Sequence, residues 1–558
     1  MDFRADKKVK ISELLLAVLS PEHKFYKLAL VYGVAIGILT LAVPIAVQTL
    51  IGAVANTAIY TPVIVLAIVL FIVLLFYVLL NSLQIYILEV FERHFFSRIV
   101  SEIVLTNIYA KHSYFESINR DELINRYFDV MNVQEIMPKL LIDGFALALQ
   151  TIVGILVVSF YHPALLMFNI VLVAFIYVTI KIWSMPSIRT AISLSKSKYN
   201  VAKWLEELAR INSNFKSERA IIYALKKSDE LVSKYNDYKK RHFKQVFTQS
   251  VVFYLLYAIF SAALLGIGGS LVVSNQLTLG QLVASELILS AIFYALSKAG
   301  GYLKHYYKLC AAVEEITHLF DVPLERETGH KILDTCRNNI SFDKAEFTYR
   351  DQKILLNFSI PENCKILASS DSYVVEKTFI DSLNRYIEPN KGRVLINDND
   401  IYDFEIHNYR NNISIVDNAF LLEGTIYQFM KFCSPQASRT EILETLKMFE
   451  VYNTVESLKE GINTKVTHTG FPLSHPEVIR LKLAGAFISK PKILVIGELF
   501  DMVANARRER IMERLSKVEG LTLIYFTNRI NLRTFDKFMY LGWQETKFFD
   551  TIEELKKQ

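Results

Sequence analysis

The residues with the clearest chemical pattern lie between positions 364 and 383. An apolar, strand-like start leads into a turn of small residues, and Lys377 and Thr378 then begin a segment of helical character. A strand, a loop and a helix that opens with Lys-Thr form the frame that grips nucleotide phosphates. The sequence therefore predicts the backbone of a phosphate-binding loop here.

The side chains inside this frame argue against phosphate binding. A working loop reads G-x-x-x-x-G-K-[ST], because glycines let backbone N–H groups close around the phosphates and tolerate positive φ. The corresponding residues 371–378 contain no glycine and include two acids, Asp371 and Glu376. Left-handed geometry at two or three of them would cost about 2–6 kcal/mol, and a carboxylate about 4 Å from a phosphate charge costs about 4 kcal/mol more. We predict that this loop does not hold a triphosphate.

The apolar residues are unevenly distributed along the chain, and this distribution indicates which helices and strands the chain forms. Before about residue 300 the chain contains six apolar runs long enough to cross a membrane; they cover about 26–51, 62–88, 140–160, 164–183, 251–273 and 279–296. Residues 52–61 carry no charge, whereas residues 89–139 carry Arg93, Arg98, Lys111, Arg120 and Arg126. This asymmetry in Lys and Arg indicates that both termini and the long inner segments are cytoplasmic. We expect a transmembrane domain over residues 1–320.

Charge and cysteine content exclude other classes of protein. The net charge of +6 is small and spread along the chain, so basic segments are explained by membrane topology and no nucleic acid is expected as a partner. The four cysteines lack C-x-x-C spacing, which argues against a zinc site or a disulfide scaffold and suits a reducing cytoplasm.

Glu286 is an acid about two turns into the sixth apolar run. An ionisable residue inside a membrane span is a candidate for substrate binding or coupling. The alternative is that the side chain reaches the nearby interface, since two turns is a shallow position.

The remainder of the chain has ordinary soluble composition. After an expected linker over residues 321–338, residues 339–558 alternate strand-like and helical segments. That alternation predicts an α/β domain.

Short motifs occur along the chain in a specific order. They are the aromatic Tyr349, the pair Lys377–Thr378, a strand at 392–396, the acid Asp417 after a strand, a Leu-Ser pair at the start of 473–477, a strand at 493–498 that ends in Gly-Glu, and Asn528 after a strand. With six spans before it, this order resembles a half-transporter of the ATP-binding cassette (ABC) exporter superfamily over essentially the whole chain. Residues 202–215 and 277–286 further resemble bacterial exporters of the peptide and type I protein secretion group.

The resemblance assigns roles to individual positions. Tyr349 stands where the family stacks an aromatic ring on adenine, and Lys377 and Thr378 stand at the end of the Walker A loop that begins at Asp371. Glu498 stands at the general-base position of Walker B, and Asn528 stands where the family has its switch histidine. An ATP site with magnesium would be expected at these positions.

Several positions depart from the family pattern. The Walker B carboxylate that orients magnesium is replaced by Gly497, the Q-loop glutamine by Asp417, and the switch histidine by Asn528, which cannot shuttle a proton. Glu498 matches the general-base position, but a general base cannot act without a positioned nucleotide. The better interpretation is that the Glu498 carboxylate holds a loop in place.

The signature segment departs as well. After Ser474, His475 and Pro476 replace two helix-opening glycines, which removes a backbone N–H and fills the space of a γ-phosphate. In this family each nucleotide lies between one chain's Walker motifs and the other chain's signature. This chain has therefore lost both contributions.

Two functions compete on this sequence. The first is a pseudo-ATPase: an inner-membrane protein with the exporter fold that serves as a subunit, scaffold or gate of an export or secretion assembly. The alternative is an exporter subunit that moves a peptide, protein or lipid-like substrate with ATP hydrolysed mainly by a partner chain. The family implies a homodimer or a heterodimer with another half-transporter, with a periplasmic adaptor as a further candidate partner. We expect no resident cofactor; ATP and magnesium would bind only if the altered site still held them.

Overall fold

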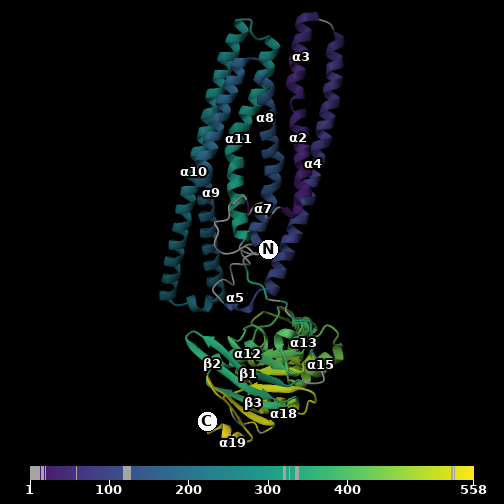
Figure 1. The fold of residues 1–558 in the computed structure, drawn as a ribbon, viewed down its shortest axis with the longest axis vertical. Helices are drawn as coiled ribbons and strands as arrows, with labels where there is room; N and C mark the ends of the chain where they lie inside the picture. The colour runs from purple at the N-terminus through teal and green to yellow at the C-terminus, as the bar shows by residue number, and fades with distance from the viewer. Residues whose placement is uncertain are drawn as a thin grey trace. The chain divides into compact units, whose positions relative to one another are not determined.

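The computed structural model describes residues 13, 18, 20–57, 60–116, 127–317, 322–325, 327, 329–333, 338–529, 532 and 534–557. The chain divides into two compact units, Met1–Leu324 and Glu325–Gln558 (Figure 1). Part of the expected linker over residues 321–338 lies outside the described residues.

The first unit is helical. Its elements are η1 (Ser20–Glu22), α2 (His23–Leu39), α3 (Ala42–Thr57), α4 (Tyr60–Tyr109), α5 (His112–Glu116), α7 (Tyr127–Lys139), the π-helical turn η2 (Leu140–Gly144), α8 (Phe145–Ser159), α9 (Pro163–Arg210), η3 (Asn212–Phe215), α10 (Glu218–Val273) and α11 (Leu279–Thr317). Among the described residues, six segments are long and apolar enough to cross a membrane: Ser20–Ala53, Tyr60–Tyr109, Phe128–Ser159, Pro163–Arg210, Glu218–Val273 and Leu279–Thr317. The prediction of six apolar helices is confirmed.

Two of these segments are not regular helices, and each contains a proline close to the irregularity. The first is interrupted at Thr40 and Leu41, between α2 and α3. Pro44 lacks the N–H that would bond to the carbonyl of Thr40, so the helix cannot continue unbroken there. In the third segment, the π-helical turn η2 directly follows the end of α7, which contains Pro138.

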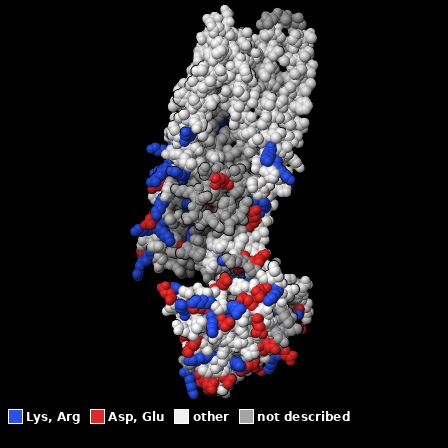
Figure 2. All heavy atoms as spheres, in the orientation of Figure 1, with Lys and Arg blue, Asp and Glu red and all other residues white. Residues whose placement is uncertain are grey.

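The helices pack through apolar side chains. α2 and α3 run along α4, and α9 packs against α10, which in turn packs against α11 (Figure 1). Figure 2 shows charged residues gathered near the end of this unit that holds α5 and almost absent from the end where α3 meets α4. Many large apolar side chains are exposed on α4, α9 and α10, as a surface that faces lipid or another helix requires.

The second unit contains a six-stranded and a four-stranded sheet. Its strands are β1 (Ile340–Tyr349), β2 (Gln352–Ile360), β3 (Lys365–Ser370), β4 (Lys391–Ile396), β5 (Asn399–Asp400), β6 (Ile413–Val416), β7 (Gly424–Thr425), β8 (Lys465–Val466), β9 (Ile493–Ile496), β10 (Thr522–Phe526), β11 (Lys537–Leu541) and β12 (Thr546–Phe549). The orders are β12-β11-β3-β10-β9-β6 and β2-β1-β4-β5, and β7 pairs with β8.

Helices connect these strands. They are α12 (Tyr373–Leu383), η4 (Ile401–Asp403), α13 (Ile406–Asn411), α14 (Ile426–Cys433), α15 (Arg439–Met448), α16 (Tyr452–Ser457), η5 (Gly461–Asn463), α17 (His475–Ile488), η6 (Glu498–Met502), α18 (Asn505–Ser516) and α19 (Ile552–Leu555). The α/β domain after the six helices is confirmed.

The arrangement of the central sheet determines where a site can form. Strands β11, β3, β10, β9 and β6 are parallel, and every residue of β9 and β10 is buried, as expected for strands covered on both faces. Parallel strands place their carboxyl ends along one edge, where ligands bind in open α/β sheets. The segments that follow β3, β6, β9 and β10 therefore meet at one edge.

Candidate functional site

A cleft of about 450 Å³ lies at this edge. It is lined by Tyr373, Glu376, Asp417, Glu498, Leu499, Asp501, Met502, Asn528 and Arg529. Tyr373 and Glu376 follow β3, Asp417 follows β6, Glu498 follows β9, and Asn528 follows β10. The structure thus brings together Asp417, Glu498 and Asn528, which the sequence analysis had singled out from three distant segments.

The predicted phosphate-binding loop is much shorter than its sequence frame suggested. Only Asp371 and Ser372 separate β3 from α12, so Lys377 and Thr378 lie in the second turn of the helix and do not open it, contrary to the prediction. None of residues 371–378 has a positive φ. Without glycine the chain avoids left-handed geometry, and the helix extends into the positions that a phosphate loop would use.

The side chain of Glu376 closes the space inside this turn. Glu376 is 2% exposed, and its Oε1 accepts a hydrogen bond from the backbone N–H of Glu498 at 3.1 Å. A Cβ atom built on Gly497 would lie 3.0 Å from the same oxygen and 3.3 Å from the Cα of Asp417. The missing side chain at position 497 therefore leaves the space that the Glu376 carboxyl fills.

Burial also sets the protonation of Glu376. Desolvation raises its pKa to about 7, and the charges of Glu498, Asp417 and Asp501 add to this rise, while the hydrogen bond from Glu498 N–H opposes it. Near neutral pH the carboxyl is therefore close to half protonated.

Lys377 and Thr378 are engaged by their own surroundings. The Nζ atom of Lys377 lies 2.8 Å from Asp381 and 3.6 Å from Asp417, and the hydroxyl of Thr378 donates to the carbonyl of Val374 at 2.8 Å. Two carboxylates thus neutralise the ammonium that a phosphate would need.

Asn528 and Glu498 contact each other across the cleft. The Asn528 side-chain amide donates a hydrogen bond to the Glu498 carboxylate. Asp417, at the end of β6, accepts a hydrogen bond from the Asn418 side chain at 2.9 Å. Glu498 therefore holds the segment after β10 against the segment after β9.

Asp501 is a site residue that the sequence analysis missed. Its carboxylate accepts hydrogen bonds from the hydroxyls of Tyr525 and Thr527 and, at 3.1 Å, from the backbone N–H of Asn528. It also forms an ion pair with the buried Arg508 at 3.0 Å. No motif identifies it, because its partners come from β10, α18 and the turn after β10. Asp501 organises the floor of the cleft.

Tyr349 and Asp371 do not line this cleft. Tyr349 is half exposed at the end of β1, and the guanidinium of Arg350 lies 5.5 Å from its ring centre. Asp371 accepts a hydrogen bond from the hydroxyl of Tyr540, a contact that, with burial, raises the pKa of Tyr540 to about 12. Asp371 thus fastens the turn after β3 to β11.

The segment predicted to act as a signature begins helix α17. Ser474 precedes the helix and His475 is its first residue. The Glu477 carboxylate accepts hydrogen bonds from the backbone N–H of Ser474 at 2.8 Å and from its hydroxyl at 2.6 Å. The positive end of the helix is therefore already faced by a carboxylate of its own first turn.

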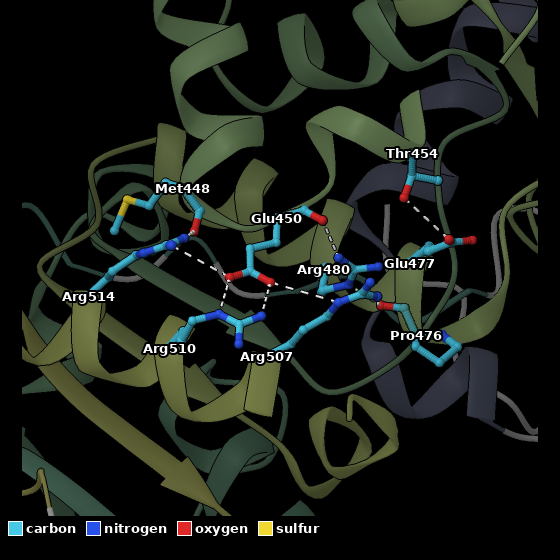
Figure 3. A network of polar contacts seen from close by, with 9 residues as sticks. All are labelled: Met448, Glu450, Thr454, Pro476, Glu477, Arg480, Arg507, Arg510 and Arg514. Atoms are coloured by element: carbon cyan, nitrogen blue, oxygen red, sulfur yellow. Dashed lines mark hydrogen bonds and ion pairs between the residues drawn. The ribbon is translucent and has the colours of Figure 1, made fainter. Parts of the chain in front are cut away.

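The protonation of Glu477 differs from that of Glu376. Burial raises the pKa of Glu477, but the hydrogen bonds from Ser474 and the charge of Arg480 outweigh it, so the pKa is lowered. Thr454 adds a hydrogen bond to the second oxygen at 3.3 Å (Figure 3). Glu477 stays charged at neutral pH.

A cluster of arginines anchors the start of α17. Figure 3 shows Arg507, Arg510 and Arg514 of α18 converging on the Glu450 carboxylate, with Arg510 Nε at 2.7 Å. Arg480 of α17 donates to the carbonyl of Glu450 and, at 3.2 Å, to that of Pro476. The arginines therefore serve as ties between α17, α18 and the turn after α15.

Glu286 lies in the second turn of α11, within the helical unit. Its Oε1 accepts a hydrogen bond from Ser290 at 3.3 Å, and among the described residues its buried Oε2 has no hydrogen-bond partner. The structure thus places one unsatisfied carboxyl oxygen inside a membrane-spanning helix.

Taken together, the cleft is lined by four carboxylates and one guanidinium, that of Arg529. Such a lining repels phosphate groups and cannot supply the backbone N–H cradle that a phosphate loop provides. The side chains that line the cleft instead form hydrogen bonds and ion pairs that hold the segments at the ends of β3, β9 and β10 together.

Comparisons with known proteins agree with this architecture. Residues 27–296 match the model of the ABC transporter transmembrane region. The ATP-dependent lipid A-core flippase of Francisella novicida is 26% identical over 286 residues, which are 50% of this chain and 47% of that protein. The alpha-hemolysin translocation ATP-binding protein HlyB of Escherichia coli O157:H7 is 25% identical over 275 residues, 48% of this chain and 39% of that protein. The chain thus spans less than half the length of these relatives.

A solved structure matches almost the whole chain. A bacterial Atm1-family ABC exporter with ATP bound superposes with a TM-score of 0.80 over 97% of both chains, at 18% sequence identity. This likeness extends through both units and shows their common fold.

Proposed function

Since residues 27–296 are an ABC transporter transmembrane region and the chain has the fold of an ABC exporter, we propose that this protein is a pseudo-ATPase. In this proposal it does not hydrolyse ATP and acts as a subunit, scaffold or gate of an export or secretion assembly. The exporter fold supplies the membrane passage, and partner binding in place of ATP shifts its conformations.

One observation carries the proposal: the Glu376 carboxyl is buried against Gly497 at the end of the central sheet. Magnesium-ATP would need a carboxylate at position 497 and an anion cradle at the start of α12. The chain has a buried carboxyl where the phosphates would enter and no side chain at position 497. The residues present do not fit magnesium-ATP, so we derive no hydrolytic step.

The start of α17 supports the same proposal from the other half of a cassette pair. A helix N-terminus binds an anion when its N–H groups are open, but Glu477 already faces the first turn of α17. We therefore expect that this chain also contributes no phosphate grip to a partner's nucleotide.

The relatives favour a second candidate function. They are named as an ATP-dependent lipid A-core flippase and an alpha-hemolysin translocation protein. By analogy, this chain would be an exporter subunit that moves a lipid-like, peptide or protein substrate with ATP hydrolysed mainly by a partner chain. Substrate transport that requires the partner's ATPase would support this candidate over a scaffold.

The setting follows from the same family and from the charge pattern. We propose a bacterial inner membrane, with both termini cytoplasmic because the segment after the second span contains several Lys and Arg residues and the segment before it contains none. A homodimer, or a heterodimer with another half-transporter, is the proposed assembly, with a periplasmic adaptor as a further partner. In a chain whose four native cysteines are replaced, labelling of Lys24→Cys only from the cytoplasmic face would support this orientation, and labelling from the periplasm would refute it.

Glu286 is proposed to face a water-accessible passage, because it is an ionisable residue inside a segment long and apolar enough to cross a membrane. In the same cysteine-free background, a water-soluble thiol reagent should modify Glu286→Cys in the membrane. Modification no faster than at the apolar position Ile288→Cys would exclude this role, since Ile288 is buried among helices.

The proposed loss of ATP binding is tested with the purified full-length chain. We expect no saturable magnesium-ATP binding at micromolar concentrations, no steady phosphate release, and equal thermal stability with and without ATP. The Lys377→Ala variant and the exposed control Lys391→Ala should then give the same null binding curves. Micromolar affinity that is lost in Lys377→Ala and kept in Lys391→Ala would refute the proposal.

A further inference from the structure

The hairpin formed by α9, η3 and α10 is strongly basic over part of its length. Residues 181–247 contain 15 Lys and Arg against 6 Asp and Glu, a net charge of +9, whereas the whole chain carries +6. Figure 2 shows Lys and Arg gathered along the side of the helical unit where α10 lies. Residues 248–273 of α10 contain no charged residue at all. The basic part of the hairpin therefore borders directly on its apolar part.

Contacts between α9 and α10 show how deep this border lies in a membrane. Two contacts join residues whose numbers add up to 432: Thr190 with His242 at 3.0 Å, and Trp204 with Ser228 at 2.8 Å. In this register Lys181, the first charged residue of α9, lies about level with residue 251 of α10. Residues 251–273 cover about 34 Å of helix, close to the hydrocarbon thickness of about 30 Å. One boundary of the hydrocarbon therefore lies near residue 251.

Lys244 and Phe247 lie just beyond this boundary, on an exposed face of α10. They are about 10 and 6 Å along the helix from residue 251, so Phe247 lies among the headgroups and the stem of Lys244 reaches them. Lys244 is exposed and forms no ion pair with the residues that the structure describes. Phe247 is 54% exposed, and its ring stacks at 5.3 Å on that of Phe243, which is 62% exposed.

An unpaired cation beside exposed aromatic rings at this depth indicates the chemistry of the ligand. Aromatic side chains gather at membrane interfaces, where their rings contact lipid, and basic groups there attract anionic headgroups. The net charge of the surrounding hairpin strengthens that attraction. We propose that this face of α10 binds an anionic phospholipid, whose phosphate pairs with Nζ of Lys244 while its acyl chains pass Phe247. The site requires only the membrane-spanning helices, so it stands whether or not the chain hydrolyses ATP.

The test compares two lipids with identical acyl chains. Phosphatidylglycerol carries a net negative charge, whereas phosphatidylcholine is zwitterionic. The full-length protein is placed in nanodiscs with equal amounts of both, and the lipids that remain bound are counted by native mass spectrometry. We expect phosphatidylglycerol to be enriched about fivefold or more, with the enrichment falling as salt is added.

Three variants separate this site from the general charge of the hairpin. Lys244→Gln should lower the enrichment about fivefold, the effect of one basic group at a membrane surface. Lys244→Arg keeps the charge and should keep the enrichment. Lys226→Gln is the matched control, because Lys226 is also exposed on α10 and forms no ion pair with a described residue, but lies about 38 Å from residue 251. It should leave the enrichment unchanged.

Contact between lipid and α10 is measured separately with Phe247→Trp. Phosphatidylglycerol with brominated acyl chains should quench the fluorescence of this variant more than that of the unmodified protein, whose three tryptophans are present in both samples. No additional quenching would show that protein, such as a second copy, covers this face, and would overturn the proposal. Equal retention of the two lipids by the unmodified protein, or an enrichment that Lys244→Gln and Lys226→Gln change equally, would overturn it as well.

Discussion

Two helix starts in the second unit solve the same problem in different ways. α12 and α17 both begin at segments that we propose to correspond to the phosphate-binding positions of an ABC cassette, and each has a glutamate in its first turn, Glu376 and Glu477. Glu376 is buried and bonds to the backbone of Glu498, which is 122 residues away. Glu477 bonds to Ser474, only three residues away.

The difference lies in what each carboxyl exchanges for water. Glu477 keeps partial solvent contact and accepts three hydrogen bonds, two from Ser474 and one from Thr454, so its charged form is favoured and its pKa is lowered. Glu376 loses its water for one backbone N–H among three other acids, so its neutral form is favoured and its pKa is raised to about 7. Glu477, which caps its own helix, is thus charged at neutral pH, whereas Glu376, which bonds to a distant segment, titrates near pH 7.

The largest effect is expected from restoring a side chain at position 497. Gly497→Asp places a second carboxylate within about 4 Å of Glu376, where like charges cost about 4 kcal/mol. We expect a comparable loss of stability in the second unit at pH 8, measured by hydrogen exchange of β9 and β10 in the full-length protein. The double variant Glu376→Gly with Gly497→Asp should recover most of that loss, because the second carboxylate then enters the vacated space. Equal losses in both backgrounds would show that the two positions do not share one space.

The next effect comes from Glu376 alone. Its ordinary pKa is 4.5 and its folded pKa is about 7, so the folded state binds more protons between these values, and stability falls as the pH rises through this window. Above pH 8 the loss is complete and is on the order of 3 kcal/mol. Glu376→Gln keeps the acceptor for Glu498 N–H and cannot ionise, so it should be the more stable protein at pH 8 and should lack this slope.

Urea unfolding of the second unit, followed between pH 5 and 8, measures this slope. The exposed Glu444→Gln is the control and should keep it. A slope that is identical in the unmodified protein and in Glu376→Gln would assign the pH dependence to another group.

The smallest effect is expected at the other helix start, with the opposite sign. The folded pKa of Glu477 lies below its ordinary value of 4.5, so its contribution is present above pH 4.5 and is lost as the pH falls through the folded pKa. Glu477→Gln should cost about 1 kcal/mol at pH 7, as expected for a helix cap, and less near pH 3. Ser474→Ala should give a similar loss in the same unfolding measurement. A stabilised Glu477→Gln at pH 7 would remove the contrast between the two helix starts.

Much of the fold could be predicted because its signals are local. Six long apolar runs separated by short turns or by charged segments indicate six helices, and apolar runs such as 493–496 indicate buried parallel strands. The order of motifs also places Asp417, Glu498 and Asn528 at strand ends, and the structure gathers these three residues at one cleft.

The error at Lys377 and Thr378 has a physical reason. A motif frame assumes the loop geometry of the working motif, but a loop without glycine has no reason to adopt that geometry, and α12 begins at Tyr373. Asp501 was missed because its role depends on Arg508, Tyr525 and Thr527, which no spacing along the chain connects to it.

The sequence by itself determined the membrane helices, the α/β order of the second unit, the absence of glycine from residues 371–378 and the glycine at position 497, because each is a property of residue type and near neighbours. Only the tertiary structure decided that Glu376 fills the space beside Gly497 and that Asp501 accepts hydrogen bonds from Tyr525 and Thr527. Both depend on which groups from distant segments lie within a few ångströms, and burial there, not residue type, sets the protonation and hydrogen bonding of a side chain.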